Sequence, residues 1–123
     1  MMANTFRVIT HDVMPASAGT PETLYTCPAD TTAIVLGLIL TNVHTTTITT
    51  SVVLSSDTAT STNSGAPAAN TDVFLLKDAP LPEGSTLEIL SGNKLALQTT
   101  DILKIDASIA DKVSVALTIM EIT

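Results

Sequence analysis

Two histidines and one cysteine are the residues of this 123-residue chain best suited to catalysis or to binding a transition metal. His11 and His44 lie far apart, each beside turn-forming residues, and neither has a partner at the spacing of a metal motif. Cys27 lacks the histidine and asparagine signature of a nucleophile and, as the only cysteine, forms no intrachain disulfide. We therefore predict that both histidines lie in exposed loops and that Cys27 is a small hydrophobic core residue.

Three aspartates, Asp101, Asp106 and Asp111, are five residues apart and could in principle gather around a calcium ion. The D-x-D-x-D-G loop is absent, however, and aspartate is common in turns because it bonds to its own backbone. We therefore expect Asp101 and Asp111 to end strands and Asp106 to point into solvent beside Lys104. Neither a G-x-S-x-G setting nor a glycine-rich phosphate loop occurs. The sequence thus predicts a protein that is not an enzyme and has no catalytic residue, metal site or cofactor.

The charge and hydropathy of the chain exclude two classes of partner. A net charge of -7, with five positively charged residues, leaves no basic stripe that could replace the counterions of a nucleic acid. The longest apolar run, within residues 31–40, is far shorter than the roughly 20 residues that cross a bilayer, and the N-terminus has no run of signal-peptide length. We expect a soluble chain that binds neither nucleic acid nor membrane.

Short apolar segments between turn signals organise the whole sequence, which reads as a single domain over residues 1–123. The Thr and Val runs are poor helix formers, and the 3.6-residue period is never sustained. The sequence therefore predicts an all-β, antiparallel sandwich or jelly roll of eight or nine strands without a substantial helix. The predicted strands cover residues 5–10, 22–27, 32–41, 46–56, 72–77, 86–90, 94–98, 102–106 and 112–122.

Turn residues predict how some of these strands connect. The PEG sequence at 82–84 is typical of a type II turn, and the SGN sequence at 91–93 predicts that residues 86–98 form a hairpin. Small polar residues at 57–70 predict a mobile loop. Residues 1–13 are a possible N-terminal arm that could add a strand to a neighbouring copy.

Residues 31–40, TTAIVLGLIL, form the least polar stretch of the chain. A strand with one wet face alternates apolar and polar side chains, so this stretch must be covered on both faces. A small domain has little material for a third layer, and we therefore expect a second subunit to cover the outer face. The alternative is that a long loop of the same chain covers Val35 and Ile39. The residues expected at the interface are Phe6, Val8, Val35, Gly37 and Ile39.

The segments ETLYTCPADTTAIVLGLILTN and LPEGSTLEILSGNKLALQTTDILKIDASIADKVSVALTIMEI resemble a group of small bacteriophage virion proteins. In that group a CPA-like turn leads to an apolar strand closed by Asn, and PxGST, GNKL and DxLKxxAS segments precede a last strand ending in MEI or LEI. The regions before Glu22 and at 57–70 fall outside this pattern. The matching positions are Pro28, Ala29, Asn42, Pro82, Gly84, Ser85, Thr86, Gly92, Asn93, Lys94, Leu95, Asp101, Leu103, Lys104, Ala107, Ser108, Glu121 and Ile122.

The resemblance implies a structural protein of a phage virion, made in the host cytoplasm. We expect a homo-oligomer, most simply a trimer, that binds the major capsid protein or other virion proteins as a capsid decoration or cement protein. A ring or fibre-anchoring subunit of the neck or tail is an alternative. A carbohydrate-binding jelly roll used for host attachment is a second alternative, although the aromatic residues usual at sugar sites are scarce.

Overall fold

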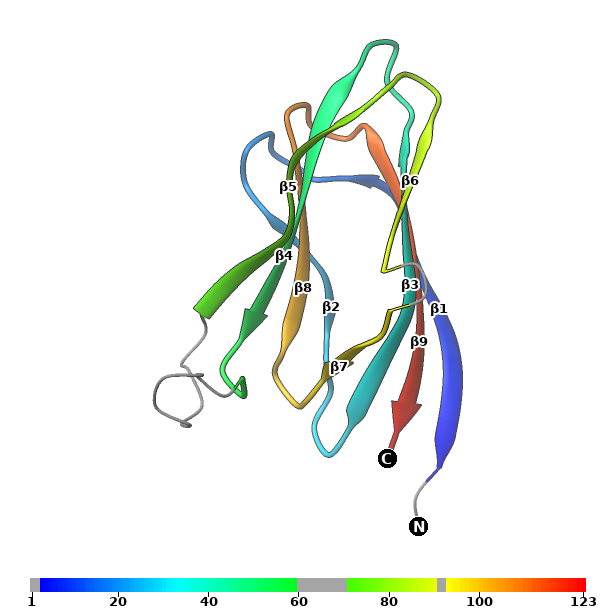
Figure 1. Ribbon diagram of the computed structural model, residues 1–123, viewed down its shortest axis with the longest axis vertical. Coiled ribbons are helices and arrows are strands. Elements are labelled where there is room, and N and C mark those ends of the chain that lie inside the picture. Colours follow the sequence, from blue (N-terminus) through cyan, green and yellow to red (C-terminus); the bar gives the residue numbers. More distant parts are fainter. Residues whose placement is uncertain (1–2, 60–70, 91–92) are drawn as a thin grey trace.

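Two antiparallel β-sheets pack face to face in this protein (Figure 1). The structure, a computed structural model, describes residues 3–59, 71–90 and 93–123. Sheet A contains β1 (Asn4–Met14), β3 (Thr32–Asn42), β6 (Thr86–Ile89), β7 (Leu95–Leu97) and β9 (Val113–Ile122). Sheet B contains β2 (Glu22–Thr26), β4 (Ile48–Ser56), β5 (Thr71–Leu81) and β8 (Ile102–Ala107). All nine predicted strands are present, and the described residues contain no helix, hence none able to span a membrane.

The order of the strands defines the topology. Sheet A runs β1-β9-β3-β6, with β7 also paired to β3, and sheet B runs β2-β8-β4-β5. Most connections therefore cross from one sheet to the other, as in the double Greek key of a jelly roll. The prediction of an antiparallel, jelly-roll-like sandwich is confirmed. Both termini lie at the same end of the molecule, where the backbones of Ala3 and Thr123 exchange two hydrogen bonds of 3.0 Å (Figure 1).

The predicted hairpin at 86–98 is wrong. β6 pairs with residues Leu38 to Thr41, and β7 pairs with residues Ala33 to Val35, so the two strands follow each other along one edge of β3. The longer strand offers backbone partners to both, and their apolar residues pack on the same core. Leu90, which follows β6, has a φ of 62° and packs partly against the core. The central glycine of the expected hairpin lies outside the described residues.

Alternating side chains build the core between the sheets. In β9 the inward residues Val113, Val115, Leu117 and Ile119 are each at most 3% exposed, as the period-2 pattern predicts. Burying an aliphatic side chain of this size contributes about 1.5–3 kcal/mol. Inward residues of the other strands, among them Leu38, Leu103 and Ile105, complete the same cluster. The alternation thus fixes which residues remain on the outer faces.

β3 changes phase at a bulge. Its pairing with β9 is irregular between Val35 and Gly37, where β3 has one extra residue. Ala33 and Val35 point inward before the bulge, and Leu38 and Leu40 point inward after it. Because an extra residue exchanges the two faces of a strand, strict alternation assigns Val35 to the wrong side.

Two predicted connections have different outcomes. Gly84 has a φ of 68°, and the Ser85 amide donates to the Pro82 carbonyl at 3.1 Å, as expected for the turn at 82–84. The N-terminal segment is not a free arm in this structure, because β1 pairs with β9 of the same chain and Ile9 packs on the core. Residues 60–70, most of the expected mobile loop, lie outside the described residues.

Candidate interaction surface

The outer side of sheet A, called the A face below, is almost free of charge. Residues paired across antiparallel strands point to the same side, so the strand registers identify its members. Among these paired outward positions Glu88 alone is charged, in a chain with a net charge of -7. The A face consists of Asn4, Phe6, Val8, Thr10, Thr32, Ile34, Gly37, Ile39, Thr41, Thr86, Glu88, Ala96, Ser114, Ala116, Thr118, Met120 and Ile122.

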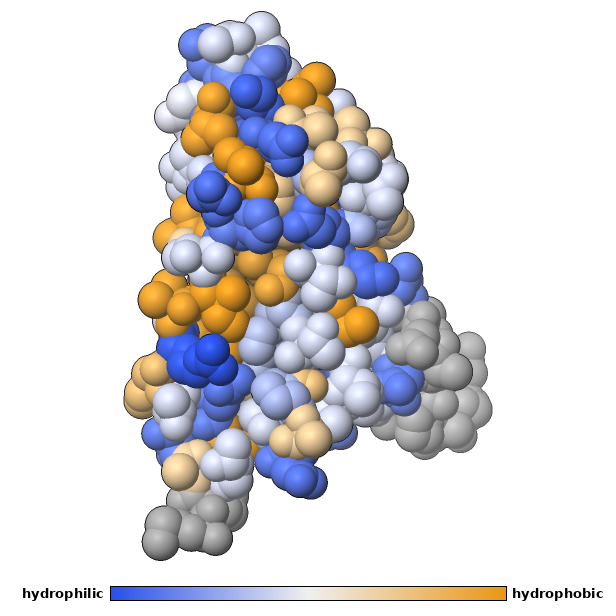
Figure 2. All heavy atoms as spheres, turned by 180° about the vertical axis from the view of Figure 1, so that it is seen from behind, coloured by the Kyte–Doolittle hydropathy of each residue, from blue (hydrophilic) through white to orange (hydrophobic). Residues whose placement is uncertain are grey.

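Large apolar side chains of the A face are open to solvent. Phe6 is 70% exposed and Val8 is 65% exposed, both on β1, which is the edge strand of the sheet. Ile39, on β3, is 39% exposed. Figure 2 shows apolar residues gathered on the side of the molecule above the grey N-terminal residues. Contiguous exposed apolar surface on a small protein usually marks a contact with another molecule.

A hollow of about 330 Å³ lies in the A face beyond Val8, towards the end of β1. Its floor is low because the outward side chains of β9 there, Ser114 and Ala116, are small, while Ile39 and Thr41 stand beside them on β3. Its lining is Thr10, His11, Asp12, Ile39, Thr41, Ser114, Val115 and Ala116.

Four of the five residues predicted for the interface lie on the A face. Phe6, Val8 and Ile39 are exposed there, and Gly37 lies at the bulge of β3 opposite Thr118. Val35 is a correction, because it is fully buried in the core. Val35 needs no covering loop either, since the opposite sheet already covers it.

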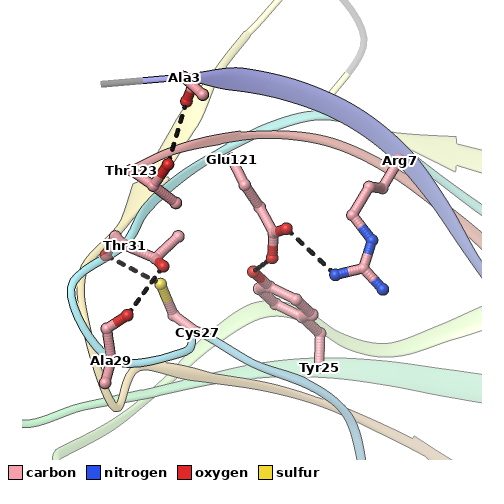
Figure 3. Close-up of polar contacts among 8 residues, drawn as sticks. All are labelled: Ala3, Arg7, Tyr25, Cys27, Ala29, Thr31, Glu121 and Thr123. Atoms are coloured by element: carbon pink, nitrogen blue, oxygen red, sulfur yellow. Dashed lines mark hydrogen bonds and ion pairs between the residues drawn. The ribbon is translucent and has the colours of Figure 1, made fainter. Parts of the chain in front are cut away.

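Inside the sandwich, a buried carboxylate joins both sheets (Figure 3). The Tyr25 hydroxyl of β2 donates to Glu121 Oε2 at 2.7 Å, and Arg7 Nη1 of β1 donates to Glu121 Oε1 at 3.1 Å. The Glu121 residue is only 8% exposed, whereas half of the Arg7 side chain is open to solvent. Both carboxylate oxygens therefore have partners, as a buried charge requires.

The environment of this cluster shifts two pKa values. The hydrogen bond from Tyr25, helped by Arg7, lowers the pKa of Glu121 although burial opposes this. Burial, followed by the neighbouring Glu121 carboxylate, raises the pKa of Tyr25. Both carboxylate oxygens of the 8% exposed Glu121 already have partners within the chain. The cluster is a structural link between β1, β2 and β9.

Sequence reasoning missed this link, although the pattern of β9 contains a signal for it. Glu121 continues the inward series of β9, two residues after Ile119, so its carboxylate had to face the core. A buried carboxylate needs donors from the opposite sheet, and Tyr25 is the only tyrosine.

Cys27 lies in the core, as predicted, and is 2% exposed. Its thiol donates to the carbonyl oxygens of Thr31 at 3.3 Å and Leu97 at 3.6 Å. Burial raises the pKa of Cys27, which keeps the sulfur protonated and weakly nucleophilic.

His44 lies in a loop as predicted but is half-buried, and His11 does not lie in a loop. His44 is in the bend after β3, but His11 lies within β1, with its Nε2 atom 3.1 Å from Glu22 Oε2 of β2. Both residues were expected in exposed loops, and the correction for His11 follows from the length of β1, which continues to Met14.

The three aspartates do not form one site. Asp101 is 3% exposed and accepts hydrogen bonds from the Ser56 and Thr58 hydroxyls and the Gln98 amide. Asp106 accepts from the Ala107 amide, and Asp111 is an exposed turn residue. In the described residues no group of three acidic, histidine or cysteine side chains could hold a metal ion.

A second hollow, of about 340 Å³, lies near the chain termini and beside Asp101. Threonines supply most of its lining, with Asp30 as its charged residue. Histidine and cysteine are absent from this lining, and threonine hydroxyls are neither acids nor bases near neutral pH. Its lining residues are Asp30, Thr31, Thr32, Thr58, Gln98, Thr99, Ile122 and Thr123.

No family model matches the chain, and no curated protein is similar to it in sequence. A protein of the T13 viral particle of IBDV is 13% identical, with a TM-score of 0.54 over 97% of this chain, which spans 30% of that protein. A protein of the virus-like particle of the prawn Macrobrachium rosenbergii extra small virus is 12% identical, with a TM-score of 0.50, and the match covers 98% of this chain and 79% of that one.

The chain shares its β-sandwich fold with proteins of viral particles. A subunit of the disulfide-linked pili of Bacillus endospore appendages is also similar, at 14% identity and a TM-score of 0.47, over 99% of this chain and 88% of that one. At such identities the likeness concerns the fold.

Proposed function

We propose that this chain is a non-enzymatic structural protein of a bacteriophage virion, which self-associates and binds the capsid as a decoration or cement protein. The A face is the observation that carries the proposal. A surface with large exposed apolar residues and few charges, on a chain of net charge -7, is suited to contact with protein. The sequence resemblance to small phage virion proteins supports the same role, and the fold shared with proteins of viral particles agrees with it.

A cement protein can stabilise a shell even when each single contact is weak. Interfaces repeated over many copies act together, so that modest single affinities still stabilise the whole particle. We propose a closed homotrimer whose copies contact each other through the A face and the free edge of β1. The major capsid protein would then bind another surface of the trimer.

A second candidate is a subunit of the shell itself. It is favoured by the likeness to the extra small virus protein, because the match covers most of both chains. The A face would equally suit a subunit of the phage neck or tail, whereas a glycan-binding attachment protein would need a sugar site on another surface.

Copy number in purified virions separates these functions. Quantitative gel densitometry of intact particles should find the chain near the stoichiometry of the major capsid protein if it decorates the shell. About a dozen copies would instead identify a neck ring and contradict decoration. Particles that lose the chain on mild washing but keep their shell would exclude a shell subunit.

The stabilising role is tested by heating virions with and without the chain. Particles depleted of it should release their DNA at lower temperature and recover when purified chain is added back. Equal release temperatures would contradict the cement function. A glycan array and a sugar-induced melting shift, if positive, would favour the attachment protein instead.

A further inference from the structure

We propose that Phe6 and Val8 of one copy pack into the A-face hollow of a second copy. This rests on the proposed function, which has copies of the chain self-associate. The A face thus carries both a hollow and two large apolar side chains that are mostly open to solvent. An engineered cavity of about 150 Å³ is enough to bind benzene, and the hollow of about 330 Å³ therefore accommodates the Phe6 ring.

Phe6 cannot reach the hollow of its own chain. Phe6 pairs with Met120, whereas the hollow surrounds the pair formed by Thr10 and Ala116. Four residues along β1 correspond to about 13 Å. Only a neighbouring molecule can bring a Phe6 ring against Ala116.

The charge distribution selects a second copy as the occupant. Two chains of net charge -7 repel each other, and the repulsion is weakest where the sparsely charged A faces meet. The acidic groups of this face lie towards its margins, with Glu88 on β6 and Asp12 at the end of the hollow. The neutral hydroxyls of Thr10, Thr41 and Ser114 line the rest of the rim around Ile39 and Ala116, and such a rim suits an apolar side chain.

The size of the face is close to that of one side of a stable interface. Four adjacent strand positions at about 4.8 Å spacing and about ten residues long present on the order of 600 Å². Stable interfaces bury about 800 Å² per partner. The face together with the free edge of β1 therefore approaches the area that a lasting contact needs.

Association affinities of paired variants test this contact. Phe6→Ala should weaken self-association about 30-fold or more, as removal of an interface anchor does. Ala116→Leu, which fills the hollow, should weaken it about 10-fold or more by excluding the ring. Phe74→Ala is the matched control, because Phe74 is 52% exposed on sheet B, and its affinity should stay within about 2-fold of the wild type.

The double variant Phe6→Ala/Ala116→Leu identifies the partner of Phe6. Sites about 13 Å apart within a chain act independently, so any coupling between them must arise across copies. The contact predicts that the double variant binds about as weakly as the weaker single variant. The proposal would be overturned if the fold-changes in affinity of the two single variants multiply in the double variant. It would also be overturned if Phe6→Ala weakens association no more than Phe74→Ala does.

Sedimentation and thermal melting complete the test. Unchanged melting temperatures of both single variants, measured at concentrations where the chain is monomeric, show that any weakening arises at the interface. A wild-type chain that remains monomeric at high concentration overturns the contact. Virion copy number decides the proposed function independently, so the two failures are distinguishable.

Discussion

The outer sides of the two sheets differ in charge and in the solvent exposure of their side chains. The outer side of sheet B, called the B face, carries Lys104, Asp106 and Asp72 at outward positions, whereas the A face has Glu88 alone. On the B face the outward residues of the central strand β4 are nearly closed to solvent, with Ser51 and Val53 each 3% exposed. On the A face Phe6 and Val8 remain open.

Contacts within the chain cover part of the B face, on which Phe74 is 52% exposed. The Asp78 amide donates to Ser51 Oγ at 2.9 Å, and the Lys77 ammonium lies 4.5 Å from the centre of the Phe74 ring. The A face has large apolar groups without such cover. Two sheets that share one core can thus have different roles, one facing water and the other suited to protein.

A charge in the centre of the A face should produce the largest effect. Thr118 lies there, paired with Val8 on one side and Gly37 on the other. Thr118→Glu should weaken self-association by about 100-fold or more, because like charges would meet at the interface. Analytical ultracentrifugation measures this.

The control is Thr23→Glu, which places the same charge on the B face beside Lys104. Both variants should keep their stability within about 0.5 kcal/mol, since the sites are exposed. If Thr23→Glu disrupts association as strongly, the distinction between the faces is wrong.

Removing the Tyr25 hydroxyl should loosen the edge of sheet A that carries Phe6. Tyr25→Phe leaves a buried carboxylate oxygen of Glu121 without its donor, which we expect to cost about 2 kcal/mol of unfolding free energy. Urea unfolding at neutral pH measures this. The control, Lys104→Gln on the B face, should change the free energy by less than about 0.5 kcal/mol.

The same link gives a pH dependence. The folded protein holds the pKa of Glu121 below its ordinary value. The ionised Glu121 therefore contributes fully to the free energy of unfolding above about pH 4.3, and this contribution is lost as the pH falls further. The stability difference between wild type and Glu121→Gln should therefore shrink below that pH. A difference that grows on acidification would contradict the lowered pKa.

Added salt should strengthen association through the A face. The overall charge of -7 opposes the approach of two copies, and salt screens this repulsion, whereas the A face offers little attraction to screen. We expect affinity to rise a few-fold between low and physiological ionic strength. Weaker binding in salt would instead indicate that opposite charges pair across the contact.

The smallest expected change in stability concerns the contact between Lys77 and Phe74 on the B face. Lys77→Gln removes the cation above Phe74, and at this exposed site we expect a loss of about 0.5 kcal/mol. Self-association should not change. Arg7→Gln, which removes a cation from sheet A, is measured for comparison. If Lys77→Gln alters the association affinity, the B face also contacts a second copy.

Local patterns predicted much of the fold. The alternation in 112–122 gave both the strand and the inward positions of β9, and the apolar Cys27 environment followed from residue type. The prediction of a hairpin at 86–98 was wrong because strand pairing depends on residues far apart in the sequence. β6 and β7 each pair with the edge of β3 and not with each other. Phe6, Val8 and Ile39 were placed on an outer face from their hydrophobicity, whereas the bulge that buries Val35 left no clear local mark.

The sequence by itself determined a β-sandwich with an apolar core, because hydrophobic period and residue type act through neighbours along the chain. Only the tertiary structure decided that the outward residues of β1, β3 and β9 join into one face with few charges. The same holds for Arg7, Tyr25 and Glu121, which meet between the two sheets. Strand order and register bring together residues more than 90 positions apart, and neither is encoded in any short stretch.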